Sequence, residues 1–389
     1  MGFYTTPSFF AVLALLIVPA AVLGLTRHNM RYYGLAATVF MCLMLFAGNL
    51  QGLVAFAAFL LVAGIATFIT FRSFTKGKKS LVLYRFCLAA AIAPLAIYKV
   101  SAVFDANIWG FLGISYVTFK SVQVIIEIRD GLIKEMNVAD WLYFVMFFPV
   151  ITSGPIDRSR RFMEDAHKVY EPREYADLLT RGILLLFVGA VYQLVLAGLL
   201  NALLEYQPYA AAIGTVGCET ADAWVYGLWM FFDFAGYSMM ACGASYCFGI
   251  RTPRNFRAPF ASIDMKDFWN RWHMTLSFWL RDYVFMRFSM FATKRKLFKQ
   301  RLYTACCGYL VNMTLMGFWH GITPEYILYG VYHGILLAAT EAFQKRSAFY
   351  KAHKNDTWFK LLSWFITINL VMFGFAIFSG QMTDLVKGL

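Results

Sequence analysis

The sequence carries little charge and lacks the common signatures of nucleotide, dinucleotide and zinc chemistry. Asp, Glu, Lys and Arg make up only 15% of its 389 residues. It contains no Walker loop, no dinucleotide-binding glycine fingerprint, no HExxH and no CxxC pair. These absences argue against a pump with its own nucleotide-driven motor, against a Rossmann dehydrogenase and against a zinc peptidase of the common kind.

The seven cysteines and six histidines do not suggest a metal centre either. None of the cysteines has zinc-site spacing, and most lie in apolar runs, where they are interpreted as small hydrophobic side chains. The histidines are scattered along the chain, so no cage for a transition metal is evident. We therefore expect no bound metal and no disulfide framework.

What the chain has in abundance is hydrophobic sequence, at 60% of residues, with a mean hydropathy of +0.58. This composition is typical of an integral membrane protein. The net charge of +13 does not indicate a nucleic-acid partner, because Lys and Arg fall in short loops between apolar runs. We expect membrane lipid to surround the chain, and no nucleic acid to bind it.

The apolar runs predict an all-α polytopic membrane protein. The predicted spans are residues 8–25, 32–48, 52–71, 81–99, 109–128, 181–204, 223–250, 303–318, 325–344 and 361–379. Two further apolar stretches, 140–155 and 272–291, have basic loops at both ends, and they are predicted to be re-entrant or interfacial.

The positions of the basic residues predict the orientation of these spans. If the loops that carry most of the Lys and Arg are cytoplasmic, only Lys99, Lys120 and Lys387 fall elsewhere. Both termini then lie outside. No linker or clear internal repeat divides the chain, so residues 1–389 are expected to form one domain.

One histidine lies at the edge of an apolar run, in Gly317-Phe-Trp-His320-Gly321. An ionisable side chain at membrane depth is costly and usually functional. Gly321 and Pro324 are expected to break the helix there, so that backbone lines a cavity. A neutral imidazole can take a proton from a hydroxyl, which makes His320 the candidate general base. The alternative is a core histidine satisfied by a carbonyl.

A second polar cluster precedes His320 by almost fifty positions. Asp264 can cap a helix, and polar residues then recur at spacings of three and four, which predicts that they share one helical face. These residues are Asn270, His273, Ser277 and Arg281. The alternative is a structural hydrogen-bond seam between helices.

Two other groups place polar side chains in apolar surroundings. Gly154-Pro155 forces irregular backbone just before Arg158, which can contact a substrate or simply anchor a re-entrant loop at the interface. Asp233 lies inside an apolar helix with Tyr237 one turn later. An intramembrane acid usually pairs internally, so a structural role is the default for Asp233.

The segments around the two histidines resemble the histidine motifs of the membrane-bound O-acyltransferases; they are Phe268-Trp-Asn-Arg-Trp-His273 and Gly317-Phe-Trp-His320-Gly321. Four more segments resemble the branch of that family that transfers D-alanine to cell-envelope polymers. They are Ser115–Phe119, Ile125–Gly131, Gly154–Arg158 and Phe232–Ser238. Their order and spacing, from about residue 100 to 345, carry the resemblance, whereas residues 1–95 fit only in hydropathy.

The resemblance implies a ring of about 10–11 transmembrane helices with re-entrant segments. A cytoplasmic tunnel and an outward funnel would meet near His320. It implies an O-acyltransferase in a bacterial cell membrane. The D-alanine donor would be a phosphopantetheine thioester on a small acidic carrier protein, with no other tightly bound cofactor. The acceptor would be a hydroxyl outside, on teichoic acid, a similar polymer or a relay protein.

The resemblance and the residues together give each polar group an expected role. His320 is the expected base and His273 a secondary catalytic residue. The side chains expected to contact substrate or line the tunnel are Asn270, Ser277, Arg281, Trp319, Arg158, Asp233 and Tyr237.

An apolar patch with a basic rim lies within residues 281–301 and suits an acidic carrier. It comprises Phe288, Met290, Phe291, Lys294 and Lys296. The same composition also fits an anchor on anionic lipid. Two alternative functions stay open: an exopolysaccharide O-acetyltransferase of the same family, and a transporter or flippase. The missing internal repeat argues against the transporter or flippase.

Overall fold

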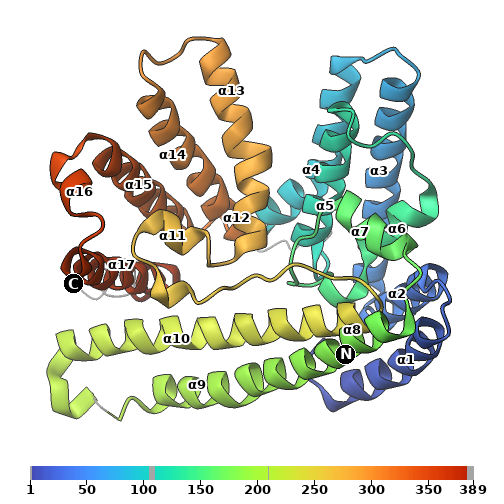
Figure 1. Cartoon of the computed structure of the whole chain (residues 1–389), viewed down its shortest axis with the longest axis horizontal. Helices are drawn as coiled ribbons and strands as arrows, with labels where there is room; N and C mark the ends of the chain where they lie inside the picture. The colour runs from blue at the N-terminus through green and yellow to red at the C-terminus, as the bar shows by residue number, and fades with distance from the viewer. Residues whose placement is uncertain (1, 105–109, 209, 383–389) are drawn as a thin grey trace. The chain divides into compact units, whose positions relative to one another are not determined.

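The computed structural model describes residues 2–104, 110–208 and 210–382, and every regular element in these ranges is a helix (Figure 1). The predicted all-α class is therefore confirmed. The chain divides into two compact units, and each is described by itself. The prediction of one domain over the whole chain stays a prediction.

Unit 1 comprises residues 1–191 and 236–254. Its helices are α1 (Pro7–Leu25), α2 (Arg31–Leu45), α3 (Leu50–Thr75), α4 (Leu81–Val103), α5 (Ile114–Arg129), α6 (Val138–Met146), α7 (Ser159–His167), α8 (Pro172–Ala190) and the end of α10 (Ala210–Cys247).

Aromatic packing places α7 in unit 1. The ring of Phe162 on α7 lies 5.0–5.4 Å from the rings of Tyr143, Phe144 and Phe147, and all four side chains are buried. Edge-to-face aromatic pairs of this kind add stability beyond the area that they bury. They fix the start of α7, which carries several charged side chains.

Unit 2 comprises residues 192–235 and 255–389. It starts within a π-helical turn (Val191–Leu196). Its helices are α9 (Ala197–Tyr206), the first part of α10, α11 (Met265–Trp269), α12 (Met274–Leu280), α13 (Met286–Lys294), α14 (Arg301–His320), α15 (Pro324–Arg346), α16 (Ala348–His353) and α17 (Thr357–Phe378). A second π-helical turn, Arg281–Phe285, joins α12 to α13.

Short polar side chains and prolines determine where many helices begin. The side chains of Asn49, Ser80 and Asn137 each accept a hydrogen bond from a backbone N–H in the first turn of the helix that follows. Asp264 does the same for α11. Proline begins α1, α8 and α15, where its missing N–H costs nothing.

Glycines allow α14 and α15 to approach closely. A Cβ on Gly317 would lie 2.4 Å from the carbonyl oxygen of Tyr326, and one on Gly330 would lie 2.5 Å from that of Met313. Small residues let membrane helices pack backbone against backbone. This contact holds the end of α14, where His320 lies, against the start of α15.

Five helices among the described residues are long and apolar enough to span a membrane: α1, α3, α4, the continuous helix 172–206, and α17. Each coincides with a predicted span. The stretch 140–155 is interrupted, since α6 ends at Met146 and a 3-10 turn follows at Phe148–Val150. Residues 274–294, by contrast, are continuously helical through α12, the π turn and α13.

Candidate active site

His320 is the last residue of α14 and is half-buried. The helix ends there because Gly321 is extended and Pro324 begins α15, so the predicted helix break is confirmed. The imidazole centroid lies 4.6 Å from the Trp319 ring and 5.0 Å from the Phe378 ring on α17. His320 therefore sits at a helix end with aromatic walls.

His273 is buried and precedes α12 in a left-handed conformation, with φ 42°. Its Nδ1 lies 3.3 Å from the side-chain oxygen of Asn255, which also accepts a hydrogen bond of 2.6 Å from Thr275. Because that oxygen can only accept, Nδ1 carries the proton and Nε2 is the unprotonated, accepting nitrogen of the neutral ring. The backbone carbonyl of Asn255 also accepts a hydrogen bond from the Met274 N–H, at 2.8 Å. Asn255 therefore stabilises this turn through both its side chain and its backbone.

Unit 2 brings the two histidines together. The His273 ring lies 6.4 Å from the Trp319 ring, and His320 is the residue next to Trp319. Burial, and secondarily repulsion from a charged His320, lowers the pKa of His273 to about 3. His273 lies in the turn before α12, outside the helices long enough to span a membrane. It is therefore neutral at physiological pH.

A cavity of about 310 Å³ in unit 2 contains three of the predicted substrate residues, Asn270, Ser277 and Arg281. Trp269 and Asn312 also line it, and the Trp269 Nε1 and Asn312 Oδ1 atoms are buried without a hydrogen-bond partner in the described chain. A buried donor and a buried acceptor left unpaired are costly. The cavity is thus suited to a ligand that offers both kinds of polar group.

The predicted single helical face across residues 264–281 is wrong at His273. The helix is interrupted between Trp269 and Met274, and the left-handed backbone of His273 changes the direction of the chain. Asn270, Ser277 and Arg281 still line one cavity, whereas His273 points to Asn255 and contacts the Phe234 ring at 4.7 Å. Spacing alone could not show this, because the break depends on contacts with distant residues.

Comparison with known proteins identifies the family of this chain. Residues 78–382 match the family model described as MBOAT, membrane-bound O-acyltransferase family. This match covers more than half of the chain and includes His273 and His320. The chain belongs to the membrane-bound O-acyltransferase family. It is accordingly an O-acyltransferase and a polytopic membrane protein, as the resemblance predicted.

Individual relatives match from about two thirds to nearly all of this acyltransferase. A teichoic acid D-alanyltransferase from Bacillus subtilis (strain 168) is 40% identical over 97% of this chain and 98% of the relative. One from Lacticaseibacillus rhamnosus is 37% identical over 98% of each. A probable alginate O-acetylase from Pseudomonas aeruginosa is 33% identical over 69% of this chain and 49% of its own length.

Asp233 and Tyr237 of this acyltransferase have separate partners. Asp233, half-buried in unit 2, accepts a hydrogen bond of 3.1 Å from Gln193 in the π-helical turn. Tyr237, buried in unit 1, contacts the Thr152 hydroxyl and accepts from the Ser153 N–H at 3.3 Å. The predicted contact of Asp233 and Tyr237 with substrate stays a prediction.

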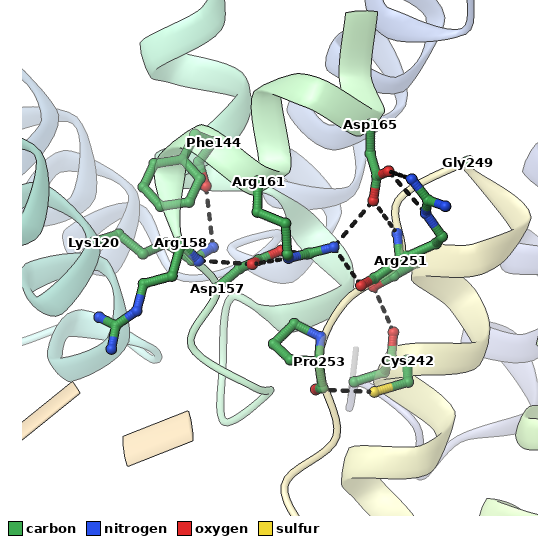
Figure 2. Close-up of polar contacts among 12 residues, drawn as sticks. Lys120, Phe144, Asp157, Arg158, Arg161, Asp165, Cys242, Gly249, Arg251 and Pro253 are labelled. Atoms are coloured by element: carbon green, nitrogen blue, oxygen red, sulfur yellow. Dashed lines mark hydrogen bonds and ion pairs between the residues drawn. The ribbon is translucent and has the colours of Figure 1, made fainter. Parts of the chain in front are cut away.

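Arg158 lies at the start of α7, beside an ion network that the sequence did not reveal. Figure 2 shows its guanidinium directed away from the network. Within the network, Asp157 contacts Arg161, and Asp165 accepts bonds from Arg161 and Arg251. Arg158 is the partly exposed member of the Gly154–Arg158 motif, and its guanidinium lies 3.4 Å from the side-chain amide of Gln123 on α5.

The predicted carrier surface divides into two parts. Met290 and Phe291 on α13 are 58% and 55% exposed, and Lys294 and Lys296 are exposed beside them. Phe288 instead packs toward α14, where a Cβ on Gly308 would lie 3.5 Å from its ring. The surface open to a partner is therefore Met290, Phe291 and the lysines.

Proposed function

We propose that this protein transfers D-alanine from a carrier-protein phosphopantetheine thioester in the cytoplasm to a hydroxyl on the outer side of a bacterial cell membrane. The teichoic acid D-alanyltransferases that match almost the whole chain support this substrate. The observation that carries the proposal is the position of His320. It ends α14 one helical turn after Met316, which lines the cavity with the unpaired polar atoms.

The proposed reaction needs a base and an oxyanion site, and it needs no nucleotide. His320 accepts the acceptor's hydroxyl proton as the oxygen attacks the thioester carbonyl carbon. When the carbon–sulfur bond breaks, the proton passes to the departing thiolate. Neutral His273, whose Nδ1–H is held by Asn255, orients the aromatic wall around Trp319 and acts as a positioning residue.

The cavity beside α14 is the proposed site of the pantetheine arm. That arm is a flexible chain with two amides, so it offers both acceptors and donors. Trp269 Nε1 and Asn312 Oδ1 are the unpaired protein atoms that would pair with them. Arg281 at the same cavity suits the phosphate end. No cofactor beyond the carrier's own arm takes part in this proposal.

O-acetyl transfer to an exopolysaccharide is the second candidate, because alginate O-acetylases match about two thirds of the chain. One experiment separates D-alanyl from O-acetyl transfer. The purified protein in liposomes is supplied with D-alanyl carrier, and the mass of the ester formed on teichoic acid is determined. An alanyl ester supports the proposal. Acetyl transfer, with no alanyl ester, contradicts it.

The D-alanyl transfer proposal also includes an acidic carrier, an outer acceptor that is a relay protein or a polymer, and an N-terminus on the outer side.

Replacing His273 by Ala is expected to lower transfer by roughly tenfold, less than the 10²–10⁴-fold typical of losing a general base. Loss of the Asn255 hydrogen bond should also cost about 0.5–1.5 kcal/mol of stability. Transfer rate and melting temperature are to be measured together. His273→Asn, whose amide can still donate to Asn255, should recover part of both. A His273→Ala protein with wild-type activity and melting would leave His273 without a role.

The exposed part of α13 is the proposed docking surface for the carrier. We expect Phe291→Asp to weaken carrier binding at least about tenfold, because an exposed aromatic anchor is typical of a binding hot spot. Lys294/Lys296→Glu should slow association by reversing the charge that guides encounter. Binding is to be measured in neutral-lipid nanodiscs, with Lys134→Glu as the charge control. Unchanged affinity in both variants would favour lipid anchoring by this surface.

A further inference from the structure

A second cavity of unit 2, of about 420 Å³, lies against α15, α16 and α17. Its wall is mostly apolar and includes Leu336, Phe343, Phe349, Phe359, Ile366 and Leu370. Three of these side chains, Phe343, Phe349 and Ile366, are 45–51% exposed. An apolar cavity that opens among exposed apolar side chains is suited to an apolar ligand, such as part of a lipid chain.

One end of this cavity is positively charged. Lys354 and Lys360 line it, both are exposed, and neither ammonium has an ion pair or hydrogen bond with any described residue. The nearby carboxylates bond to groups other than these lysines. Asp264 accepts from Gln344 at 2.9 Å and from a backbone N–H, and Asp356 pairs with His353 at 2.8 Å. Neither lysine is therefore held in place by a carboxylate, and both ammonium groups are open to an anionic ligand.

The elements around the charged end have the composition of a membrane interface. The short helix α16 begins at a Ser347 cap, joins α15 to α17 and carries Phe349 and Tyr350. Trp358, 49% exposed, follows in the first turn of α17, which is long and apolar enough to span. Aromatic and basic residues gather at the depth of lipid headgroups. The lysines thus lie where a phosphate group is available.

We propose that this cavity binds one anionic phospholipid from the surrounding membrane. Part of an acyl chain would lie against Phe343, Phe359 and Ile366, and the phosphate would lie between Lys354 and Lys360. The combination selects this occupant. A soluble anion would leave the apolar wall uncovered, and a zwitterionic lipid would bring no net negative charge to the two lysines.

The proposed lipid would also contact the start of α11. Asp264 and Met265 belong to the cavity wall, and Gln344 links the cap of α11 to α15. A second link, from Lys266 to Glu341 at 2.8 Å, joins the same two helices. A bound lipid would therefore cover the hydrogen bond that fixes α11, the helix that leads to Asn270.

Retention of lipid by the purified protein tests the proposal without requiring its acyltransferase activity. Phosphatidylglycerol or phosphatidylcholine is titrated into detergent-solubilised protein, and bound lipid is counted by native mass spectrometry. We expect one phosphatidylglycerol to bind more tightly than phosphatidylcholine. Each of Lys354→Ala and Lys360→Ala should weaken it roughly fivefold, since a basic residue near an anionic lipid contributes about 1 kcal/mol. Lys351→Ala, on α16 but outside the cavity wall, is the matched control.

A second variant tests the apolar part of the site. Thr340→Phe adds bulk to the cavity wall without changing the charge, so it should reduce phosphatidylglycerol retention. Inorganic phosphate should bind measurably to neither the wild type nor the Thr340→Phe variant. Melting temperatures of all variants establish that they are folded. Equal retention of the two lipids by the wild type, or wild-type retention in both lysine variants, would overturn the proposal. Phosphate binding equal to that of the lipid would do the same.

Discussion

His320→Ala is expected to reduce D-alanyl transfer by about 10²–10⁴-fold while leaving the protein folded and inserted. The imidazole ends α14 and is only half-buried, so its removal leaves no deep cavity behind. The aromatic rings beside it, Trp319 and Phe378, remain in place to hold the backbone. Transfer is to be measured as D-alanyl ester formed per protein per minute.

The control for this variant is His28→Ala, which removes an exposed histidine from unit 1. It should leave transfer unchanged. His320→Gln should be as inactive as His320→Ala, because an amide hydrogen-bonds but cannot accept a proton near neutral pH. Near-normal esterification by His320→Ala at normal abundance would refute the assignment of the base. Activity retained by the Gln variant alone would make His320 a positioning residue.

The parts of this site that sequence predicted are those that depend on local chemistry. Gly321 and Pro324 break a helix wherever they occur in such a pattern, and the structure ends α14 and begins α15 at these positions. The long apolar helices were also predictable, because spanning a membrane requires only length and hydropathy. The capping role of Asp264 likewise involves a backbone N–H only three residues away.

What sequence did not predict depends on distant partners. Asn255 fixes His273 from eighteen positions upstream, and nothing in their spacing marks the pair. The left-handed backbone at His273 is uncommon for a residue other than glycine, so spacing rules gave a continuous helix instead. Trp269 and Asn312 resemble ordinary membrane-helix residues until the structure shows their unpaired polar atoms in one cavity.

The ion network of unit 1 is the clearest case of such a distant partnership. Asp165 on α7 and Arg251 after α10 are 86 positions apart. The Asp165 side chain is only 1% exposed, and it accepts from the Arg251 backbone N–H at 2.8 Å, from its Nε at 2.9 Å and from Arg161 at 3.0 Å (Figure 2). One carboxylate therefore ties α7 to the segment that follows α10.

Asp165→Ala is expected to destabilise the folded protein by roughly 3 kcal/mol, because removing one partner of a buried ion network typically costs 3–5 kcal/mol. The lower figure applies because the Arg161 and Arg251 side chains stay partly exposed, at 33% and 50%, so water can solvate them once the acid is gone. The expected result is a melting temperature several degrees lower in detergent, measured by loss of the monodisperse chromatographic peak after heating.

The control is Glu164→Ala, at the exposed neighbouring position on α7, which should melt like the wild type. Asp165→Asn keeps the shape and loses the charge, so it should fall between the two. If Asp165→Ala had the same melting temperature as Glu164→Ala, the network would not be what joins α7 to Arg251.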